Sequence, residues 1–411
     1  MTKNYSVTVR QLMKKMEQEF YDIFRHCHEN PELSFREFNT TAYIKETLRS
    51  LDIEVMEIEG LETGVVGLLR GGSDGPCIGL RADIDALPIL EESTSPHPSK
   101  NPGVMHACGH DTHYGSLLCA AKILAAMRED IRGSVKFLFQ PAEELNLGAK
   151  KMISLGCLEN PHVDAIFGLH NSPEIPLGTV AVKDGPLMAG VDRIELTIHG
   201  KGGHGGIPQR NADPIVASAA IIQSLQTIVS RNLSPLQAGV VSICNIQAGH
   251  GTTNNVCPDE AQMYGTVRTY SQENKHFMDK RIHEITENIA AAYNTKADVK
   301  YIYELPVTDN TRRPGWPDLL SVANAAVTGA GAKPVDPEPS GGGEDFPIFV
   351  EGFDGHPGVP GFFYWLGVRH EETDCVYSWH SPHFKADREC IPIGAGVYAL
   401  SALEGCRALS K

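Results

Sequence analysis

Hydrophobic positions in the first 185 residues follow a helical spacing at the start and a strand-like spacing afterwards. Two amphipathic helical patterns fill Tyr5 to Leu51 and are separated by Asn30-Pro31-Glu32. Further on, apolar runs typical of strands alternate with helical patterns; the strands are Ile53–Ile58, Gly64–Leu69, Cys77–Arg81, Val135–Gln140 and Ala165–His170, and the helices His113–Arg128 and Gly148–Leu155. This alternation predicts an α/β fold with a mostly parallel sheet and helices on both faces.

The pattern changes after Gly185. It reads β-α-β-β-α-β over Val191–His199, Asp213–Arg231, Val240–Ile246, Gln262–Tyr270, Gln272–Tyr293 and Val299–Tyr303. This order is typical of a compact two-layer, ferredoxin-like unit. An α/β pattern then returns, with a helix over Pro317–Ala330, a strand over Gly361–Leu366 and a helix after Pro392. We therefore expect a discontinuous catalytic domain of residues 1–185 and 306–411. A lid or dimerisation domain of residues 186–305 would be inserted into it through two crossings, near Gly185 and Pro306.

The charge balance excludes two classes of partner. The 411 residues include 36 Lys and Arg against 51 Asp and Glu, a formal net charge of −15. This acidic balance argues against binding to nucleic acid or to an anionic membrane surface. No apolar run approaches the roughly 18 residues of a membrane span, and the polar N-terminus lacks a signal-peptide pattern. The ten cysteines are scattered without a CxxC pair, so we expect a reduced, cytoplasmic enzyme.

Two glycine motifs suggest chemistry that their surroundings do not support. Gly71–Gly75 fits the GxSxG pattern of serine hydrolases, but it lies between two strand-like runs, where its residues form an ordinary turn. Gly200–Gly205 fits GxGxxG, but a polar stretch with Pro208 follows it in place of a phosphate-binding helix. We therefore expect neither a serine esterase acting through Ser73 nor a dinucleotide site.

The segment Met105–His113 contains three histidines, one cysteine and one aspartate just before a predicted helix. Cys108 and His110 are separated by one glycine, which lets the backbone turn tightly enough for both side chains to face one ion. The alternative is a helix start that Asp111 caps, with a cysteine that is merely buried.

Further candidate ligands follow strands or lie in turns. Glu143 and Glu144 come directly after the apolar strand Val135–Phe139, and His170 ends another apolar strand. The turn Trp379–Phe384 adds two more histidines. When two adjacent carboxylates lie on a turn, one can point to a metal and the other to a water. The alternative is a solvated helix start, where such pairs are also common. Together these groups exceed what one tetrahedral ion needs, so they predict two metal ions.

These motifs resemble those of the aminoacylase and hippurate hydrolase family. This family includes indole-acetyl-amino acid hydrolases and is the cysteine-containing amidohydrolase branch of the dinuclear zinc carboxypeptidases. The resemblance covers nearly the whole chain and is carried by GLRADIDALPI (79–89), MHACGHD (105–111), QPAEE (140–144), FGLHN (167–171), GTVRT (265–269), GGEDF (342–346) and HSPHF (380–384). It implies a zinc-exopeptidase-like α/β domain with an inserted lid.

The resemblance also implies roles for individual residues. The metal ligands would be Cys108, His110, Glu144, His170 and His380. Cys108 would bridge two divalent ions, zinc or manganese, with nickel or cobalt as alternatives, and Glu143 would be the general base. Asp83 would orient a liganding imidazole from behind. His383 is a weaker candidate than His380, and His106 and His113 are expected to have structural or supporting roles.

Three residues of the insert receive roles in the same way. His204, within Gly202–Pro208, resembles a lid histidine that stabilises the oxyanion, often in the partner subunit's active site. Asn255 and Arg268 resemble positions that contact substrate. The alternatives are a mobile glycine loop around His204 and a surface ion pair for Arg268. The resemblance implies a homodimer or a dimer-based oligomer.

The function implied is hydrolysis of the amide bond in an N-acyl-amino acid, giving a carboxylic acid and a free amino acid. A dipeptidase or carboxypeptidase of the same family is one alternative, and a non-catalytic binder of small molecules is another. Retention of both glutamates and of every proposed ligand argues against the binder. The chain departs from the family pattern at Thr112-His113-Tyr114 and in a third glycine before Glu344. Both departures put the identity of the substrate in doubt.

Overall fold

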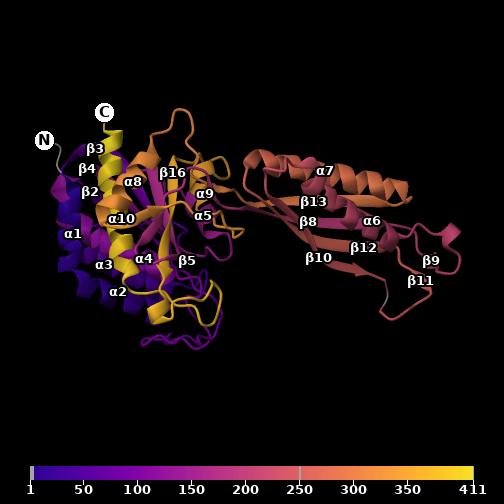
Figure 1. Ribbon diagram of the computed structural model, residues 1–411, viewed down its shortest axis with the longest axis horizontal. Helices are drawn as coiled ribbons and strands as arrows, with labels where there is room; N and C mark the ends of the chain where they lie inside the picture. Colours follow the sequence, from indigo (N-terminus) through magenta and orange to yellow (C-terminus); the bar gives the residue numbers. More distant parts are fainter. Residues whose placement is uncertain (1–3, 250, 411) are drawn as a thin grey trace. The chain divides into compact units, whose positions relative to one another are not determined.

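The computed structural model describes residues 4–249 and 251–410, which divide into two compact units (Figure 1). The host unit contains residues 4–185, 309–338 and 344–410, and the inserted unit contains residues 186–308 and 339–343. The chain passes between the units after Gly185 and Thr308, close to the two expected crossings. It passes again after Glu338 and Gly343, so Pro339–Gly343 form a second, short excursion into the inserted unit.

An eight-stranded sheet forms the centre of the host unit, in the order β1-β2-β4-β3-β5-β16-β6-β15. Its strands are β1 (Glu54–Met56), β2 (Val65–Arg70), β3 (Ser73–Asp83), β4 (Arg132–Gln140), β5 (Ala165–Pro176), β6 (Thr179–Ala181), β15 (Lys333–Val335) and β16 (Gly361–Arg369). The central strands β4, β3, β5 and β16 are parallel to one another, whereas β2 and β6 join them antiparallel. This confirms the predicted mostly parallel α/β fold.

Helices cover this sheet on both faces. They are α1 (Tyr5–Lys15), α2 (Glu17–Glu29), α3 (Phe38–Ser50), α4 (His110–Ala126), α5 (Gly148–Ser154), α8 (Leu319–Ala330), α9 (Pro347–Glu351) and α10 (Cys390–Leu409), with short 3-10 turns at Arg128–Asp130 and Glu371–Thr373. The larger core lies between the sheet and the helices α4, α8 and α10 (Figure 1). The shorter helices α5 and α9 contact each other and pack on β4 and β16.

Strand β3 shows how the sheet separates an apolar face from a charged one. Leu80 and Ala82 belong to the core under α4 and α10. Because successive side chains of a strand point to opposite faces, Arg81 and Asp83 lie on the other face. Both are completely buried, so they require polar partners there.

The inserted unit has the predicted β-α-β-β-α-β order. Its elements are β7 (Pro186–Met188), β8 (Gly190–His199), β9 (Gly203–His204), α6 (Pro214–Thr227), β10 (Gly239–Ala248), β11 (Val256–Cys257), β12 (Glu260–Thr269), α7 (Gln272–Ala292) and β13 (Lys296–Leu305), with a 3-10 turn at Pro208–Arg210, a π-helical turn at Ile228–Asn232 and β14 (Thr308–Asp309) at the crossing. Four strands form an antiparallel sheet in the order β10-β12-β8-β13, and α6 and α7 pack on its buried face.

Two helix boundaries differ from the prediction. The first helical pattern is interrupted at Met16, which ends α1 and precedes α2, and neither proline nor glycine marks this break. Helix α4 begins at His110, three residues before the predicted start, because Gly109 adopts a left-handed backbone (φ 83°) directly before it. His110 therefore lies in the first turn of α4.

Neither of the two glycine motifs is followed by the helix that its usual chemistry requires. Ser73 is exposed at the start of β3 and is followed by a strand in place of the helix that a nucleophile elbow requires. Gly200–Gly205 is followed by the single turn Pro208–Arg210. Among residues 4–249 and 251–410, no helix is long and apolar enough to cross a membrane.

Candidate metal centre

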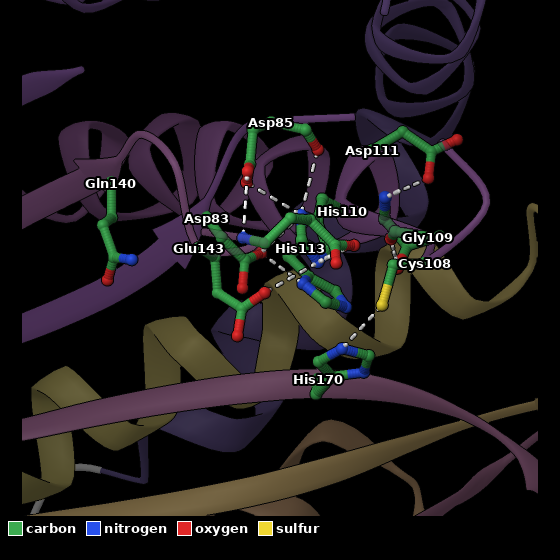
Figure 2. Close-up of polar contacts among 12 residues, drawn as sticks. Asp83, Asp85, Cys108, Gly109, His110, Asp111, His113, Gln140, Glu143 and His170 are labelled. Atoms are coloured by element: carbon green, nitrogen blue, oxygen red, sulfur yellow. Dashed lines mark hydrogen bonds and ion pairs between the residues drawn. The ribbon is translucent and has the colours of Figure 1, made fainter. Parts of the chain in front are cut away.

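The proposed ligands converge at one edge of the host sheet. Asp83 ends β3, Gln140 ends the neighbouring strand β4, and His170 lies on β5 at the same edge, next to the first turn of α4 (Figure 2). The carboxyl ends of adjacent parallel strands are the usual place for sites in open α/β sheets. The strands therefore bring together residues that are far apart in the sequence.

Gly109 allows the Cys108–His110 turn. Its φ of 83° is left-handed, and a Cβ at this position would lie 2.3 Å from Nδ2 of Asn171. A glycine is therefore required on both conformational and steric grounds. Sγ of Cys108 lies 3.4 Å from Nε2 of His170, so this turn directs the thiol toward the histidine of β5 (Figure 2).

The hydrogen bonds of two histidines fix which ring nitrogen is free. Nδ1 of His110 donates to the carbonyl oxygen of Asp85 at 2.9 Å, and Nδ1 of His170 donates to the carbonyl oxygen of Asn171 at 2.7 Å. A carbonyl oxygen can only accept, so both Nδ1 atoms carry the proton and both Nε2 atoms keep a lone pair. Nε2 of His110 is buried without a hydrogen-bond partner, as expected of a metal ligand.

The two adjacent glutamates directly follow a residue with an unusual backbone conformation. Ala142 has a φ of +51°, which is rare for a residue with a side chain, and its N–H donates to Oε1 of the buried Glu37 at 2.9 Å. The N–H of Glu144 donates to Oδ2 of Asp85 at 3.1 Å. Oε2 of Glu143 and Oε1 of Glu144 each lie 3.9 Å from Nε2 of His110.

His380 completes the cluster from the C-terminal part of the chain. It has a left-handed backbone (φ 62°), and its N–H donates to the carbonyl oxygen of Ala107 at 2.8 Å. Its Nε2 lies 3.7 Å from Oε1 of Glu144, and about half of its side chain is exposed. His380 is therefore the candidate ligand on the solvent side.

The ligand atoms form two groups that share one residue. Atoms of Cys108, His110 and His170 lie within 4.8 Å of one another, and so do atoms of Cys108, Glu144 and His380. Thiolate, imidazole and carboxylate are the ligands that zinc and related ions prefer. Oε1 of Glu144 is also buried without a hydrogen-bond partner among the described residues, so the side chains present fit two metal ions, with Cys108 common to both groups.

Burial dominates the electrostatics of this cluster. It raises the pKa of the Cys108 thiol well above its usual value and lowers the pKa of His170 well below it. Burial, together with the nearby carboxylates of Glu344 and Asp345, also raises the pKa of Glu143 well above its usual value. Uncompensated negative charge is thus costly here, and cations would relieve this cost.

Two carboxylates lie behind the candidate ligands. Asp83 was expected to orient a liganding histidine; its Oδ1 accepts from Nδ1 of His113 at 2.5 Å and lies 4.0 Å from Nδ1 of His110. The carboxylate beside His110 belongs to Asp85, at 3.2 Å. Asp85 is two residues after Asp83 and therefore points to the same side of the chain, which is the signal that could have revealed it.

The three other histidines of the motifs have different surroundings. Nε2 of His113 accepts from the backbone N–H of Asn171 at 2.8 Å, so His113 ties α4 to β5. His106 is buried without a hydrogen-bond partner among the described residues. His383 is exposed, and its Nδ1 donates to the carbonyl oxygen of Glu92 at 2.9 Å, outside the ligand groups.

The three candidate residues of the insert lie within the inserted unit. His204 on β9 pairs with Val256 of β11, and the N–H of Gly205 donates to the carbonyl oxygen of Asn255 at 2.8 Å. The structure therefore places His204 and Asn255 side by side. Arg268 lies on β12, and its guanidinium donates to the hydroxyl of Thr266 and, at 3.1 Å, to the carbonyl oxygen of Val267.

Comparisons with known proteins agree with this geometry. The model of peptidase family M20/M25/M40 matches residues 79–404. An N-acetylcysteine deacetylase of Bacillus subtilis is 44% identical over 375 residues, which cover 91% of this chain and 93% of the relative. A thermostable carboxypeptidase of Saccharolobus solfataricus is 38% identical, with 95% of this chain and 96% of the relative covered.

A solved structure extends the likeness to the fold. It is a Bacillus subtilis protein described as a dinuclear metal-binding peptidase of the M20 family, with 38% identity and a TM-score of 0.83. The match covers 96% of this chain and 99% of that one. These findings confirm the resemblance that the motifs carried. The chain belongs to peptidase family M20/M25/M40 and is a metal-dependent amidohydrolase.

Proposed function

We propose that this enzyme cleaves the amide bond between a small acyl group and the α-nitrogen of an amino acid. The observation that carries the proposal is Glu143, whose carboxylate lies beside two groups of metal-ligand atoms that share Cys108. The likeness to an N-acetylcysteine deacetylase over nearly the whole chain favours acetyl groups among the acyl groups.

We infer that two divalent ions, zinc or manganese, occupy the centre. Cys108, His110 and His170 would hold one ion, and Cys108, Glu144 and His380 the other. When bound, these ions would supply Lewis acidity to the amide carbonyl and lower the pKa of a water. The soft thiolate favours zinc, although sulfur, nitrogen and oxygen ligands together also accommodate nickel or cobalt.

Glu143 is the proposed general base. Its side chain is buried, and it is adjacent in the sequence to the proposed ligand Glu144. It would accept a proton from the attacking water and pass it to the leaving nitrogen. A carboxyl whose pKa is raised by burial and by neighbouring carboxylates is suited to hold that proton between the two steps.

The inserted unit is proposed to act as a lid. His204 would donate a hydrogen bond to the oxyanion that develops on the substrate carbonyl, while Asn255 and Arg268 would contact the substrate. The exposed glycine loop around His204 and the crossings between the units support a movement that completes the site when substrate binds.

We also infer a homodimer. Among the described residues, strand β10 lies at an edge of its sheet and pairs with β12, and it exposes Val240 and Ile246. Helix α6 exposes Ile215 and Val216. An unpaired edge and apolar side chains on one unit are features of a surface that a symmetric partner covers.

A reduced compartment, the cytoplasm, is the proposed location. All ten cysteines lie within the described residues, and none of them forms a disulfide. Cys108 must also stay a free thiol to act as a ligand.

The proposal is tested with Glu143→Gln and a panel of substrates. We expect turnover of N-acetyl amino acids to fall about a hundred- to ten-thousand-fold, with two ions per chain retained. Mass spectrometry of the metal-loaded enzyme with N-acyl amino acids and dipeptides then separates an amidohydrolase from a carboxypeptidase. Turnover within a few-fold of the wild type in a metal-replete Glu143→Gln enzyme would contradict the assignment of the base, and cleavage of dipeptides alone would favour the peptidase.

A further inference from the structure

A buried network of charges lies behind the turn that carries Glu143. Its centre is Arg81, which is completely buried on β3. Nε of Arg81 donates to Oε1 of Gln140 at 2.8 Å, and Nη2 donates to Oδ1 of Asp345 at 2.7 Å and to Oε1 of Glu344 at 2.9 Å. The network therefore joins the last residue of β4 to residues more than two hundred positions later.

Asp345 is the most constrained member of this network. Its Oδ1 accepts from Arg81 and, at 2.8 Å, from Nε2 of Gln140; its Oδ2 accepts from Nε2 of Gln140 at 2.9 Å and from the N–H of Ala149 at 3.1 Å. Each oxygen of this buried carboxylate thus accepts two hydrogen bonds. An amide at this position would place an NH₂ group against at least one donor, and Gln140 cannot flip to compensate because Arg81 holds its oxygen.

Glu344 faces the proposed base itself. Its Oε1 accepts from Arg81 and from the N–H of Phe346 at 2.9 Å, whereas its Oε2 is buried without a partner. Oxygen atoms of Glu143, Glu344 and Asp345 lie within 4.8 Å of one another. Arg81 contacts the carboxylates of Glu344 and Asp345 and thereby holds both of them beside Glu143.

The same segment continues directly into the inserted unit. Gly343 belongs to that unit and Glu344 to the host unit. Within the inserted unit, the N–H of Ser340 donates to the carbonyl oxygen of Leu187 at 3.0 Å. A Cβ on Gly343 would lie 2.5 Å from Cγ2 of Val191, so this residue is closely packed there. Glu344, which lies beside Glu143, is thus one peptide bond away from a segment that packs within the inserted unit.

We propose that Glu344 and Asp345 are positioning residues that fix the Gln140–Glu144 turn and transmit the position of the inserted unit to Glu143. The proposal rests on the proposed role of Glu143 as the base. It also gives a role to the glycines before Glu344, which the sequence marked as a departure from the family pattern.

The first experiment measures coupling between Asp345 and Glu143. We expect Asp345→Asn to lower kcat about tenfold to a hundredfold, because small misplacements of a catalytic group are costly, with KM and two bound ions retained. In a Glu143→Gln background the same change should have less than about a twofold effect, since the group it positions is already gone. Asp336→Asn, at an exposed ion pair of the host unit, is the matched control.

Glu344→Gln covers the case in which Asp345→Asn does not fold. Its amide keeps an oxygen for Arg81 and Phe346 and replaces only Oε2, the oxygen without a partner among the described residues. We expect it to fold, to bind two ions and to lose kcat in a way that the Glu143→Gln background again removes. Wild-type kcat in Glu344→Gln, or losses that simply multiply with those of Glu143→Gln, would overturn the positioning role. If Glu143→Gln itself stays active, the assignment of Glu143 as the base is wrong, whatever the Glu344 and Asp345 variants show. Failure of the proposed function can therefore be told apart from failure of the positioning role.

The second experiment tests transmission from the insert. Gly343→Ala should lower kcat several-fold with metal content unchanged, because the added methyl displaces the segment next to Glu344. Gly341→Ala is its control, since the nearest atom to an added Cβ there is Oη of Tyr270 at 3.9 Å. Equal turnover in the two variants would show that the insert does not act through this segment.

Discussion

The metal centre of the host unit and the His204 loop of the inserted unit are built in opposite ways. Around the metal centre, Asp83, Asp85, His110 and His113 are completely buried, and each has a hydrogen-bond partner in a different element. His204 is exposed and has glycines on both sides, and its Nδ1 accepts from the nearby N–H of Gly206 at 3.0 Å. The side chains of the first region are thus held by several long-range hydrogen bonds, whereas the His204 side chain has local contacts only among the described residues.

This difference assigns separate tasks to the two regions. Metal ligands must hold their positions within a few tenths of an ångström, which requires supporting hydrogen bonds on every side. A group that stabilises a charge only in the transition state gains from arriving late, since closure also removes water. Substitutions in the two regions should therefore affect different measurements.

The largest effect is expected at the residue shared by the two ligand groups. Cys108→Ala removes a ligand from both ions, so we expect loss of bound metal and of measurable turnover. Elemental analysis of the purified protein and an activity assay test this. Cys244→Ser, at an exposed cysteine of the inserted unit, should leave both unchanged. Retention of two ions in Cys108→Ala would exclude Cys108 as the bridge.

His204→Ala should separate turnover from metal binding. Loss of a hydrogen bond to the developing oxyanion should lower kcat about a hundredfold or more, with the metal content of the wild type. His199→Ala, an exposed histidine of the same unit, is the control. If His204 acts across a dimer, mixing inactive His204→Ala and Glu143→Gln subunits should restore part of the activity, and absence of rescue would place His204 within its own chain.

Asp85→Asn should weaken metal binding while leaving the chemistry intact. Asp85 accepts from Nδ1 of His110 and from the N–H of Glu144, so it orients two proposed ligands. Removal of such a supporting carboxylate should reduce metal affinity about ten- to a hundredfold, measured by competition with a chelator. At saturating metal, kcat should approach that of the wild type. Unchanged affinity would show that the backbone carbonyl of Asp85 is sufficient.

The smallest effect concerns stability and its dependence on pH. His28 is buried, and although burial lowers its pKa, hydrogen bonds to Asp111 at 2.6 Å and Glu91 at 3.3 Å raise it to about 10. A raised folded-state pKa stabilises the protein fully below the unfolded value of 6.5 and less as pH rises toward 10. In denaturant titrations, His28→Asn should therefore lower the free energy of unfolding most strongly near pH 6. The difference in this free energy between the variant and the wild type should become smaller toward pH 10. A difference independent of pH would contradict a charged His28, and the exposed His162→Asn serves as control.

Local sequence was sufficient for much of the fold and for the candidate ligands. The spacing of apolar residues predicted most strands of the two sheets, because burial on one or both faces leaves a period that can be read directly. The short strands β6 and β15 were not predicted. Cys108 and His110 could be found because they lie in a short motif directly before a predicted helix, and Glu144 because it follows an apolar strand. The break at Met16 had no such signal, since no residue there prevents a helix.

The supporting network could not be read from the sequence in the same way. Arg81 and Asp345 are 264 positions apart, and their pairing depends on which strands become neighbours. Glu37, which holds the turn before Glu143, lies at the start of α3, where a glutamate is normally a solvated helix residue. Long-range partners of this kind depend on which strands become neighbours. Local sequence patterns predict the fold class but not this order of strands.

The discontinuity of the host unit has a consequence for the order in which the chain acquires its structure during synthesis. Strand β16 pairs along β5, which is made almost two hundred residues earlier, and α10, the last helix, fills the core beside α4 and α8. The host sheet therefore cannot close until β16 has been synthesised. The four-stranded sheet of the insert is complete once Leu305 has emerged, so the insert can fold first and hold the ends of the unfinished host close together.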